Sequence, residues 1–301
     1  MLDIRKEDRG NGVEKQGVRP QIYPISAERE LARLNLTYIN AMRKSFKIYL
    51  PELLDLYEIN TRSDSRFDDL SGFRDKVASV FNKISSDFEK STSRFQIHKL
   101  VHKAAEVAKR ASVRDWIDIV KRSLGLTVYK EYYDDLLSEK INRWVANNVS
   151  YVSTLPKAQL NVLQDIIIWG YQTKQPKINV YNRIQKQLGT SKSYARMLAR
   201  DQLGTLNSQI MQEEQKSMGC TKYKWKTKHD SRVRESHAEL DGKIFSWDNP
   251  PEMWIITKSG RRSSGRFCHP GEDYQCRCVA VPVFDVEEAG KMAARHRYRS
   301  M

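Results

Sequence analysis

An ordered series of Asp, Arg, His, Gly and Cys residues near the C-terminus carries the side chains best suited to chemistry. It begins as Asp230-x-Arg232-x-Arg234-x-x-His237-x-x-x-Asp241-Gly242 and continues, past a variable stretch, with Pro270-Gly271 and Cys276-Arg277-Cys278. No other part of the sequence concentrates these residue types in this way. Imidazole and thiolate groups are zinc ligands, and imidazole beside carboxylates is typical of acid–base catalysis. The series therefore raises two chemical hypotheses.

The first hypothesis is a structural zinc site. Cys276 and Cys278 place two thiolates within reach of one ion, and Cys268 and His269 lie a few residues earlier. With His237, one of these two earlier residues would complete a tetrahedral set, for which we take His237, Cys268, Cys276 and Cys278. Cys-x-Cys is less usual in zinc sites than Cys-x-x-Cys. The alternative is therefore that the cysteines are reduced and packed in the core, with a hydrogen-bonded histidine beside them.

The second hypothesis is acid–base catalysis by Asp230, His237 and Asp241. A metal-dependent nuclease needs a histidine beside a pair of metal-binding carboxylates with an open coordination position. The acids of this series are explained instead by helix capping and ion pairing. The sequence also has no recognisable motif around a Ser or Cys nucleophile and no Gly-rich phosphate loop. We therefore expect that the protein is not an enzyme.

The segment Asp230–Gly242 is predicted to form one short helix followed by a turn. Asp230 or its neighbour would cap the helix, and Asp230 would pair with Arg234, four residues later. His237 shares a helical face with the apolar residues four before and three after it, which places it inward. The closing Asp-Gly is a turn signal that leads into a strand starting at Lys243.

The segment Thr221–Lys228 predicts a half-buried strand, because its residue types alternate strictly. Tyr223 and Trp225 share one face, and the opposite face carries four lysines: Lys222, Lys224, Lys226 and Lys228. This lysine row is either a solvated face that guards a sheet edge or a stripe that faces phosphate groups. Further strands are predicted over residues 243–247, 253–257 and 279–284.

The chain before this region is predicted to be helical. Apolar residues recur at helical spacing from residue 26 to Pro51, and again over 73–88 and 96–123. Further helices are expected over about 130–150, 156–172, 176–188 and 191–218. The predicted class is α+β, in four parts: a flexible N-terminal arm over 1–24, a helical region over 25–190, a small mixed α/β module over 191–285 and a basic C-terminal tail over 286–301.

The charge and hydropathy of the chain indicate which classes of binding partner to expect. The 301 residues include 52 Lys and Arg against 37 Asp and Glu, a net charge of +15, which favours nucleic acid or an acidic protein surface. No apolar run approaches the roughly 18 residues that predict a membrane span. The N-terminus also lacks the apolar core of a signal peptide. We therefore expect a protein that folds in a reducing cytosol, without disulfides and without a membrane partner.

Residues from about 191 to 284 resemble the C-terminal domain of the tailed-phage Mu F-like minor head protein (head morphogenesis) family. That family combines Ala-x-x-x-Ala-Arg-Thr-Glu on a helix, an aromatic strand, Asp-x-Arg-Val-Arg-x-x-His-x-x-x-Asp-Gly, a Pro-rich insert and a closing Asn-Cys-Arg-Cys. The matching segments here are Ala195–Gln202, Tyr223–Trp225, Asp230–Gly242, Pro270–Asp273 and Gln275–Cys278. Two departures are Asp201-Gln202 in place of Thr-Glu, which puts any role of that Glu in doubt, and Gln275 in place of Asn.

The resemblance implies a low-copy virion protein of the head interior near the portal, present in the host cytoplasm during assembly. Its implied partners are the portal protein, the scaffold or major capsid protein, and packaged double-stranded DNA. It implies roles in procapsid assembly and in DNA binding or genome ejection. Some relatives carry an appended toxin enzyme; because this chain ends about 17 residues after the strand at 279–284, we expect no such domain here.

Within this interpretation the series is mainly structural. We expect its residues to hold helix, insert and closing strand together: Asp230, Arg232, Arg234, Asp241, Gly242 and Arg277. The candidates for DNA contact are the lysine row and three arginines of the tail, Arg295, Arg297 and Arg299. The alternatives are a metal-dependent nucleic-acid-processing enzyme and a general DNA-binding protein unconnected with the portal.

Overall fold

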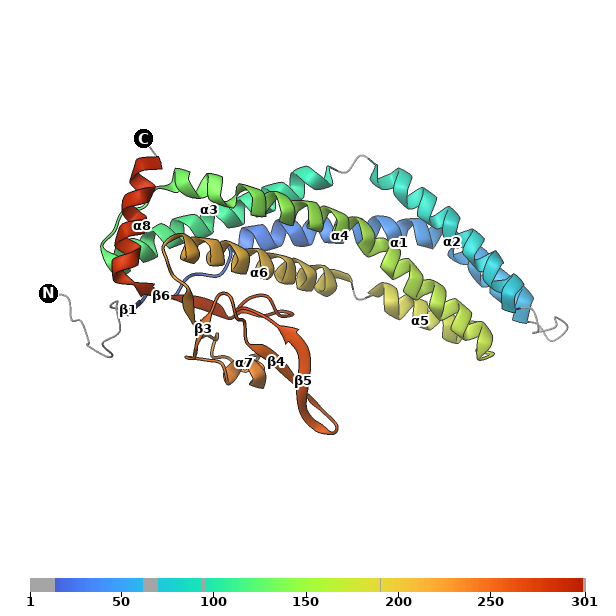
Figure 1. Cartoon of the computed structure of the whole chain (residues 1–301). Coiled ribbons are helices and arrows are strands. Elements are labelled where there is room, and N and C mark those ends of the chain that lie inside the picture. Colours follow the sequence, from blue (N-terminus) through green and yellow to red (C-terminus); the bar gives the residue numbers. More distant parts are fainter. Residues whose placement is uncertain (1–13, 62–69, 94–95, 190, 300–301) are drawn as a thin grey trace. The chain divides into compact units, whose positions relative to one another are not determined.

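The structure is a computed structural model that describes residues 14–61, 70–93, 96–189 and 191–299 (Figure 1). The helices are α1 (Ile25–Thr61), α2 (Leu70–Thr92), α3 (Ile97–Leu124), α4 (Lys130–Gln172), α5 (Lys177–Gly189), α6 (Ser191–Ser217), α7 (Glu235–Ala238) and α8 (Val286–Arg299). The strands are β1 (Glu14–Gln16), β2 (Lys222–Lys226), β3 (Ile244–Ser246), β4 (Glu252–Thr257), β5 (Gly260–Phe267) and β6 (Val279–Asp285). Long helices followed by short antiparallel strands confirm the α+β class.

Two helices continue through a proline at which the sequence predicts an end. α1 passes through Pro51 to Thr61, and α4 is one helix through Pro156, where we expected two helices. A proline inside a helix removes one backbone hydrogen bond and costs about 3 kcal/mol. Buried leucines flank each proline, among them Leu53 and Leu155. Burying a leucine side chain contributes about 2 kcal/mol, so packing on each side outweighs the local cost.

The chain divides into two compact units, and the divisions fall inside helices. Unit 1 comprises Met1–Glu28, His102–Val145 and Arg200–Met301, and unit 2 comprises Arg29–Val101 and Ala146–Ala199. This division differs from the expected parts, because the middle of the helical region 25–190 belongs with the C-terminal strands. The reason lies in tertiary packing that helical periodicity does not report: Trp116 of α3 stacks on Phe284 of β6, with ring centroids 5.8 Å apart.

The regular secondary structure described in unit 2 is all helical, and aromatic side chains pack its helices together. Phe73 of α2 stacks on Tyr171 of α4 at a centroid distance of 4.0 Å, and Phe46 of α1 meets Phe81 of α2 at 6.0 Å. Gly170 permits a close approach of α4 to α5, because a Cβ at that position would lie 2.4 Å from a methyl carbon of Val180. None of the residues expected to do chemistry lies in this unit.

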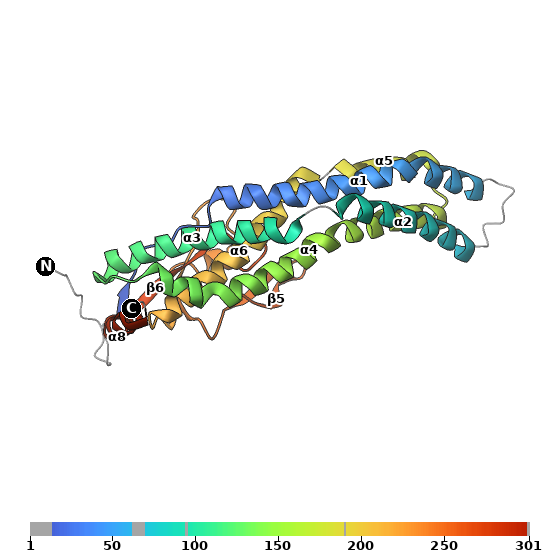
Figure 2. The same ribbon diagram turned by 90° about the horizontal axis from the view of Figure 1, so that it is seen from above.

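Unit 1 contains an antiparallel four-stranded sheet in the order β1-β6-β2-β3. The unit 1 parts of α3 and α6 lie along it (Figure 1, Figure 2). The side chain of Gln215 on α6 donates to the backbone oxygen of Ala280 in β6 at 2.9 Å. β6 is buried along almost its whole length, and β2 alternates as predicted, with Tyr223 and Trp225 buried. The sheet therefore forms a rigid base for the loops at its ends.

Both ends of the chain differ from expectation. Residues 14–24 of the expected flexible arm make defined contacts: β1 pairs with β6, and the Gly17 amide donates to the Pro282 oxygen at 2.8 Å. Residues 1–13 lie outside the described range. The expected basic tail forms α8 from Val286 to Arg299, with Ala289 and Ala293 buried. Small buried alanines among many charges give a weak periodic signal, so the helix was missed.

A separate hairpin, β4–β5, extends from unit 1 as a two-stranded sheet. β4 was predicted, but β5 was not, because its sequence Gly-Arg-Arg-Ser-Ser-Gly-Arg-Phe has one apolar residue and no alternation. The strand is nevertheless paired with β4 over Gly260–Ser263 and again at Phe267, with a shift of register between the two. Backbone pairing across a hairpin therefore specifies a strand here that side-chain pattern does not.

Candidate functional site

The register of the sheet brings the two halves of the Asp, Arg, His and Cys series together. β2 and β6 are antiparallel, and Lys226 at the end of β2 lies opposite Val279 at the start of β6. The segment that follows β2 and the segment that precedes β6 must therefore emerge at the same edge of the sheet. These segments, 227–243 and 268–278, carry the predicted site residues.

The short helix after β2 is smaller than predicted, and Asp230 does not cap it. α7 covers only Glu235–Ala238, and no side chain caps its N-terminus. Asp230 instead accepts two hydrogen bonds of 2.6 Å from the guanidinium of Arg277, so the expected pair with Arg234 is wrong. The bonds from Arg277 hold the pKa of Asp230 well below its ordinary value. This bidentate ion pair connects the segment 227–243 directly to the Cys-x-Cys segment.

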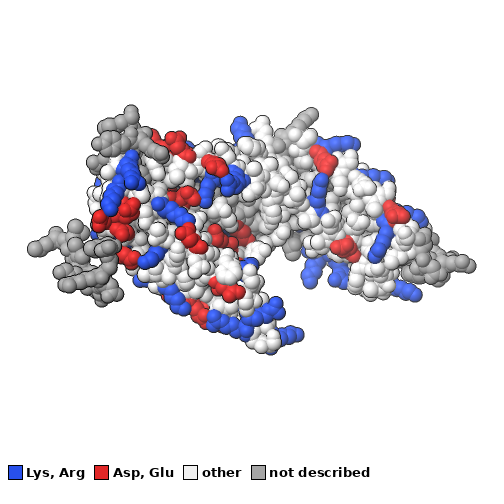
Figure 3. Space-filling view, viewed as in Figure 1, with Lys and Arg blue, Asp and Glu red and all other residues white. Residues whose placement is uncertain are grey.

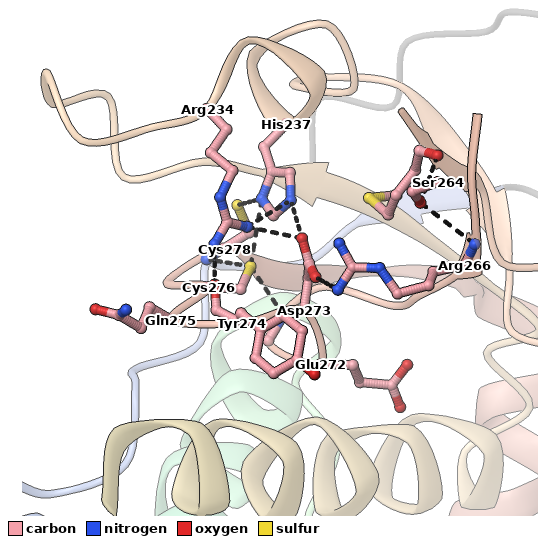
Figure 4. Close-up of polar contacts among 12 residues, drawn as sticks. Arg234, His237, Ser264, Arg266, Glu272, Asp273, Tyr274, Gln275, Cys276 and Cys278 are labelled. Carbon is pink, nitrogen blue, oxygen red and sulfur yellow. Dashed lines mark hydrogen bonds and ion pairs between the residues drawn. The ribbon is translucent and has the colours of Figure 1, made fainter. Parts of the chain in front are cut away.

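His237 lies at the centre of the site and is buried, as expected (Figure 4). Its Nδ1 atom is 3.5 Å from the Sγ atoms of both Cys276 and Cys278. Its Nε2 atom is 3.1 Å from Oδ2 of Asp273. The ring packs edge-on against Trp225 at a centroid distance of 5.6 Å, which fixes its orientation. One imidazole thus faces two sulfurs with one nitrogen and a carboxylate with the other.

Asp273 joins the histidine to two arginines, and the sequence pattern did not identify this role. Its buried carboxylate accepts from Arg234 Nη1 at 2.7 Å and from Arg266 Nη1 at 2.6 Å, in addition to its contact with His237. Arg234 also donates to the backbone oxygen of Tyr274. Asp273 belongs to the Pro270–Asp273 segment of the resemblance, but no residue there indicated that a buried cation cluster surrounds it. The pairing depends on the fold.

The site electrostatics favour charge separation between imidazole and sulfur. Burial alone would lower the pKa of His237, but hydrogen bonds to Asp273 and Cys276 raise it to about 9. The hydrogen bond with Cys278, followed by the contact with His237, holds the pKa of the Cys276 thiol well below its ordinary value. The thiol of Cys278 has a raised pKa, because it would place a second thiolate beside Cys276. The surroundings therefore favour a thiolate at Cys276 over one at Cys278.

Cys268 and His269, the two candidates for a fourth zinc ligand, lie elsewhere. Within the described ranges the one His, Cys, Asp and Glu group with donors all within 4.8 Å of one another is His237, Cys276 and Cys278. Cys268 packs at the edge of the apolar cluster around Trp225, and burial raises its pKa to about 11. The Nδ1 atom of His269 lies 3.0 Å from the Tyr223 hydroxyl. The predicted ligand set is thus corrected to three residues.

A cleft of about 190 Å³ opens above this group. Its lining includes the three residues His237, Cys276 and Cys278 and five cationic side chains, Arg200, Lys228, Arg232, Arg234 and Arg277. Some of these cations are paired, for example Arg200 with Glu28 at 3.1 Å. Lys228 and Arg232 are exposed. The cleft is therefore basic at its rim and lined by sulfur and imidazole at its base.

The remaining residues of the series hold the segments 227–243 and 268–278 in their conformations. The carboxylate of Asp241 accepts from the Thr227 amide at 2.7 Å and from its hydroxyl at 3.0 Å. Gly242 has a φ of +78°, which explains why a glycine follows Asp241 in the turn. Asp201 lies at the position where the family that this chain resembles carries Thr. Its side-chain carboxylate accepts a hydrogen bond from the backbone amide of Gln275. Asp201 is thus a further site residue that the pattern did not identify.

The lysine row is largely occupied by local partners. The amine of Lys222 lies 2.9 Å from Glu14, that of Lys224 lies 3.1 Å from Gln16, and that of Lys226 lies 3.4 Å from Asp241; the fourth, Lys228, is exposed. Arg295 is exposed on α8, whereas the side chains of Arg297 and Arg299 lie outside the described set.

Comparisons with known proteins match this region to a family. Residues 162–281 match the family described as Phage Mu protein F like protein, so the match begins within α4, ends within β6 and includes the whole site. The Minor head protein GP7 of Bacillus phage SPP1 is 24% identical over 281 residues, covering 81% of this chain and 90% of that protein. No solved structure matches the chain.

Two other relatives share only part of their length with this chain. An uncharacterized protein of Haemophilus influenzae is 29% identical over 226 residues, covering 73% of this chain and 47% of that protein. The NAD(+)--arginine ADP-ribosyltransferase EFV of Enterococcus faecalis is 30% identical over 129 residues, which is 42% of this chain and 26% of that protein. This chain thus spans about half of the first and about a quarter of the second.

Proposed function

We propose that this chain, which belongs through residues 162–281 to the Phage Mu protein F like family, is a minor head protein at the portal vertex of a tailed phage. The observation that carries the proposal is the match with the SPP1 minor head protein, which extends over 90% of that protein's length. A phage head protein is a component of the virion and works with other capsid-assembly proteins. Among the described residues no helix is long and apolar enough to cross a membrane.

The portal assignment rests on symmetry and on the low copy number that the family resemblance implies. A protein present in few copies cannot occupy every equivalent position of a symmetric shell. It needs a place that differs from the rest, and the vertex that holds the portal is such a place. The partners that we propose are accordingly the portal protein and the scaffold or major capsid protein next to it. The head interior at this vertex also contains the packaged DNA.

We assign DNA contact to exposed cations of unit 1 rather than to the whole lysine row. Figure 3 shows Lys and Arg side chains gathered along the β4–β5 hairpin, at the lower edge of the view. Lys258 and Arg262 of the hairpin are exposed, and so is Lys228 at the cleft. Such side chains neutralise phosphates without reading bases. A role in holding or delivering the genome end would follow from this contact.

The portal assignment is tested by assembly. The portal protein, when co-expressed with this chain, should co-purify with it, and heads purified from infected cells should contain the chain at a few copies per portal ring. Heads made without the gene should form with a changed yield or infectivity. Absence of the chain from purified heads, or no association with the portal protein, would leave only a general DNA-binding role.

The enzymatic alternative has a separate test. The transferase activity in the name of the Enterococcus relative belongs to that protein, of which this chain covers 26%. The site here offers sulfur and imidazole rather than the paired carboxylates that bind magnesium in nucleases. DNA cutting that requires Mg²⁺ or Mn²⁺ and is lost in His237→Ala would replace the structural role with a nuclease. We expect no cutting.

A further inference from the structure

We infer that His237, Cys276 and Cys278 bind one zinc ion through Nδ1 and two Sγ atoms, with the fourth coordination position open to the basic cleft. The site does not depend on the proposed function. It concerns a group of side chains whose role the family match does not explain. The inference replaces the four-ligand set expected from the sequence, in which Cys268 closed the coordination sphere.

The distances between the three donors suit a tetrahedral ion. Zinc lies about 2.0–2.1 Å from nitrogen and about 2.3 Å from sulfur, so nitrogen and sulfur on adjacent tetrahedral corners are about 3.6 Å apart. The two observed Nδ1–Sγ distances are 3.5 Å each. All three donors lie within 4.8 Å of one another. An ion therefore fits between them with little movement of the side chains.

Hydrogen bonds around the three donor side chains orient them for metal binding. Asp273 lies beside Nε2 of His237, so the neutral tautomer that metal binding requires would keep its proton on Nε2 and turn its Nδ1 lone pair toward the two sulfurs. The backbone amides of Gly271 and Cys278 both point at Sγ of Cys276, each at 3.4 Å. Amide hydrogen bonds stabilise a thiolate and orient it as a ligand. A packed, reduced thiol would not need two amide donors and a fixed imidazole.

The donor types select the metal. Two thiolates and one imidazole are soft ligands, which exclude magnesium and calcium and favour zinc among the divalent ions that cells supply. When an ion binds, the thiols of Cys276 and Cys278 would both be deprotonated, and the two thiolates would neutralise the charge of Zn²⁺. Because the whole cluster is buried or half-buried, such charge balance lowers the cost of holding an ion there.

The fourth position faces the cleft rather than another protein ligand. Among the residues that the structure describes, no further His, Cys, Asp or Glu joins the cluster. The same three residues line the cleft together with Lys228, Arg232 and the other cations of its rim. Water occupies such a position in zinc sites with three protein ligands. The surrounding positive charge would also favour replacement of that water by a small anion.

The first experiment is metal analysis of the full-length chain, expressed without a histidine tag in zinc-supplemented medium. We expect one zinc per chain, and its loss in Cys276→Ser, Cys278→Ser and His237→Gln. Cys268→Ser and Cys220→Ser are the matched controls, because both remove a thiol from unit 1 without touching the cluster; they should retain the zinc. Circular dichroism identifies any variant that fails to fold.

A second measurement on the unaltered chain does not depend on variants. A chelator should remove the zinc and lower the melting temperature, and added zinc should restore it, because a ligand that binds only the folded state stabilises it. Replacement by Co²⁺ should give thiolate-to-metal charge-transfer absorption and the visible bands of a tetrahedral ion. Added azide should shift those visible bands by occupying the open position.

Three outcomes would overturn the inference. A folded chain that contains no zinc and gives no charge-transfer band with Co²⁺ has reduced, packed cysteines. Loss of zinc in Cys268→Ser would restore the closed four-ligand set. A cobalt spectrum that azide leaves unchanged would show that the fourth position is filled by the protein.

Discussion

At the scale of single residues, Asp273 is the position of the site whose burial depends most on its charged partners. Its side chain is 3% exposed, yet it carries a negative charge that Arg234, Arg266 and His237 share. A buried carboxylate is costly unless such partners surround it. Removal of this negative charge would leave these cations without the carboxylate that they share. The cluster is therefore stable only as a complete set.

Asp273→Asn keeps the shape of the side chain and removes the charge. Breaking a buried ion pair costs about 3–5 kcal/mol. Because the arginine side chains here are 40–44% exposed, we expect a loss of about 2–3 kcal/mol in the free energy of unfolding. Urea denaturation measures it. The control is Asp248→Asn, whose carboxylate is 75% exposed and whose loss should change the stability much less; equal losses would contradict the arrangement around Asp273.

Gln275 adopts a left-handed backbone, with a φ of 51°. The resembled family carries Asn here, and Asn tolerates this conformation better than Gln does. Gln275→Asn should therefore raise the free energy of unfolding by about 0.5 kcal/mol, whereas the β-branched Gln275→Val should lower it by about 1 kcal/mol or more. Thermal melts of both variants check the ordering. A Val variant as stable as the Asn variant would refute the backbone explanation.

At the scale of elements, the loop before β6 rests on α6 through two glycines. A Cβ on Gly204 would lie 2.9 Å from the backbone oxygen of Gly271, and one on Gly271 would lie 3.1 Å from that of Gly204. Backbone atoms cannot move away as a flexible side chain can. This contact sets the distance between α6 and the segment that carries the cysteines.

Gly204→Ala should therefore destabilise the chain by about 1–3 kcal/mol, through overpacking. The control is Gly290→Ala on α8, where a Cβ meets nothing within 4 Å. Because alanine favours a helix over glycine by about 1 kcal/mol, the control should be neutral or more stable. Denaturant titrations compare the two. A stabilising Gly204→Ala would mean that the loop does not rest on the helix.

Glu214 on α6 is a buried carboxyl whose partner is Ser112 of α3, at 3.0 Å. Burial raises its pKa well above the ordinary value, so the folded state favours the protonated form. Its contribution is therefore fully present below the unfolded pKa of about 4.3 and declines as the pH rises toward the folded pKa. Glu214 thus weakens the fold at neutral pH.

Glu214→Gln should remove this dependence. We expect the variant to be more stable than the unaltered chain at pH 7, by on the order of 1 kcal/mol, with the difference shrinking as the pH falls toward 4. Melting temperatures across that range give the result. A variant that is less stable at pH 7 would indicate that the carboxylate is ionised and paired.

At the scale of the whole molecule, the net charge of +15 concerns partners rather than the fold. Much of the lysine row is occupied by Glu14, Gln16 and Asp241, so the exposed cations of the hairpin and the cleft carry the proposed DNA contact. Local pairing thus removes part of a basic surface that composition alone suggests.

The chain should bind double-stranded DNA without sequence preference, and the logarithm of the binding constant should fall linearly with the logarithm of salt concentration. The double variant Lys258→Ala with Arg262→Ala should reduce that slope by up to about 2, roughly 0.9 for each lost phosphate contact. The paired lysines provide the control: Lys222→Ala with Lys224→Ala should change it less. Fluorescence anisotropy measures both, and salt-independent binding would refute the assignment.

Much of the fold and part of the site can be predicted from local patterns in the sequence. Helical periodicity predicted most helices, strict alternation predicted β2, and spacing placed His237 inward with two nearby sulfurs. These properties are local, because an apolar face depends on residues a few positions apart. The ordered motif also sufficed for the resemblance to the phage head family. The continuation of α1 through Pro51 and of α4 through Pro156 is not predictable from the sequence, since burial on each side overrides the local signal.

The side-chain partners within the site follow from the tertiary structure alone. The register of β2 against β6 sets Asp230 on Arg277 rather than on Arg234, places Asp273 beside His237, and leaves Cys268 outside the cluster. Such contacts join residues some 36–47 positions apart in the chain. Spacing along a sequence carries no information about distances of that kind, because they follow from how strands align and where loops emerge.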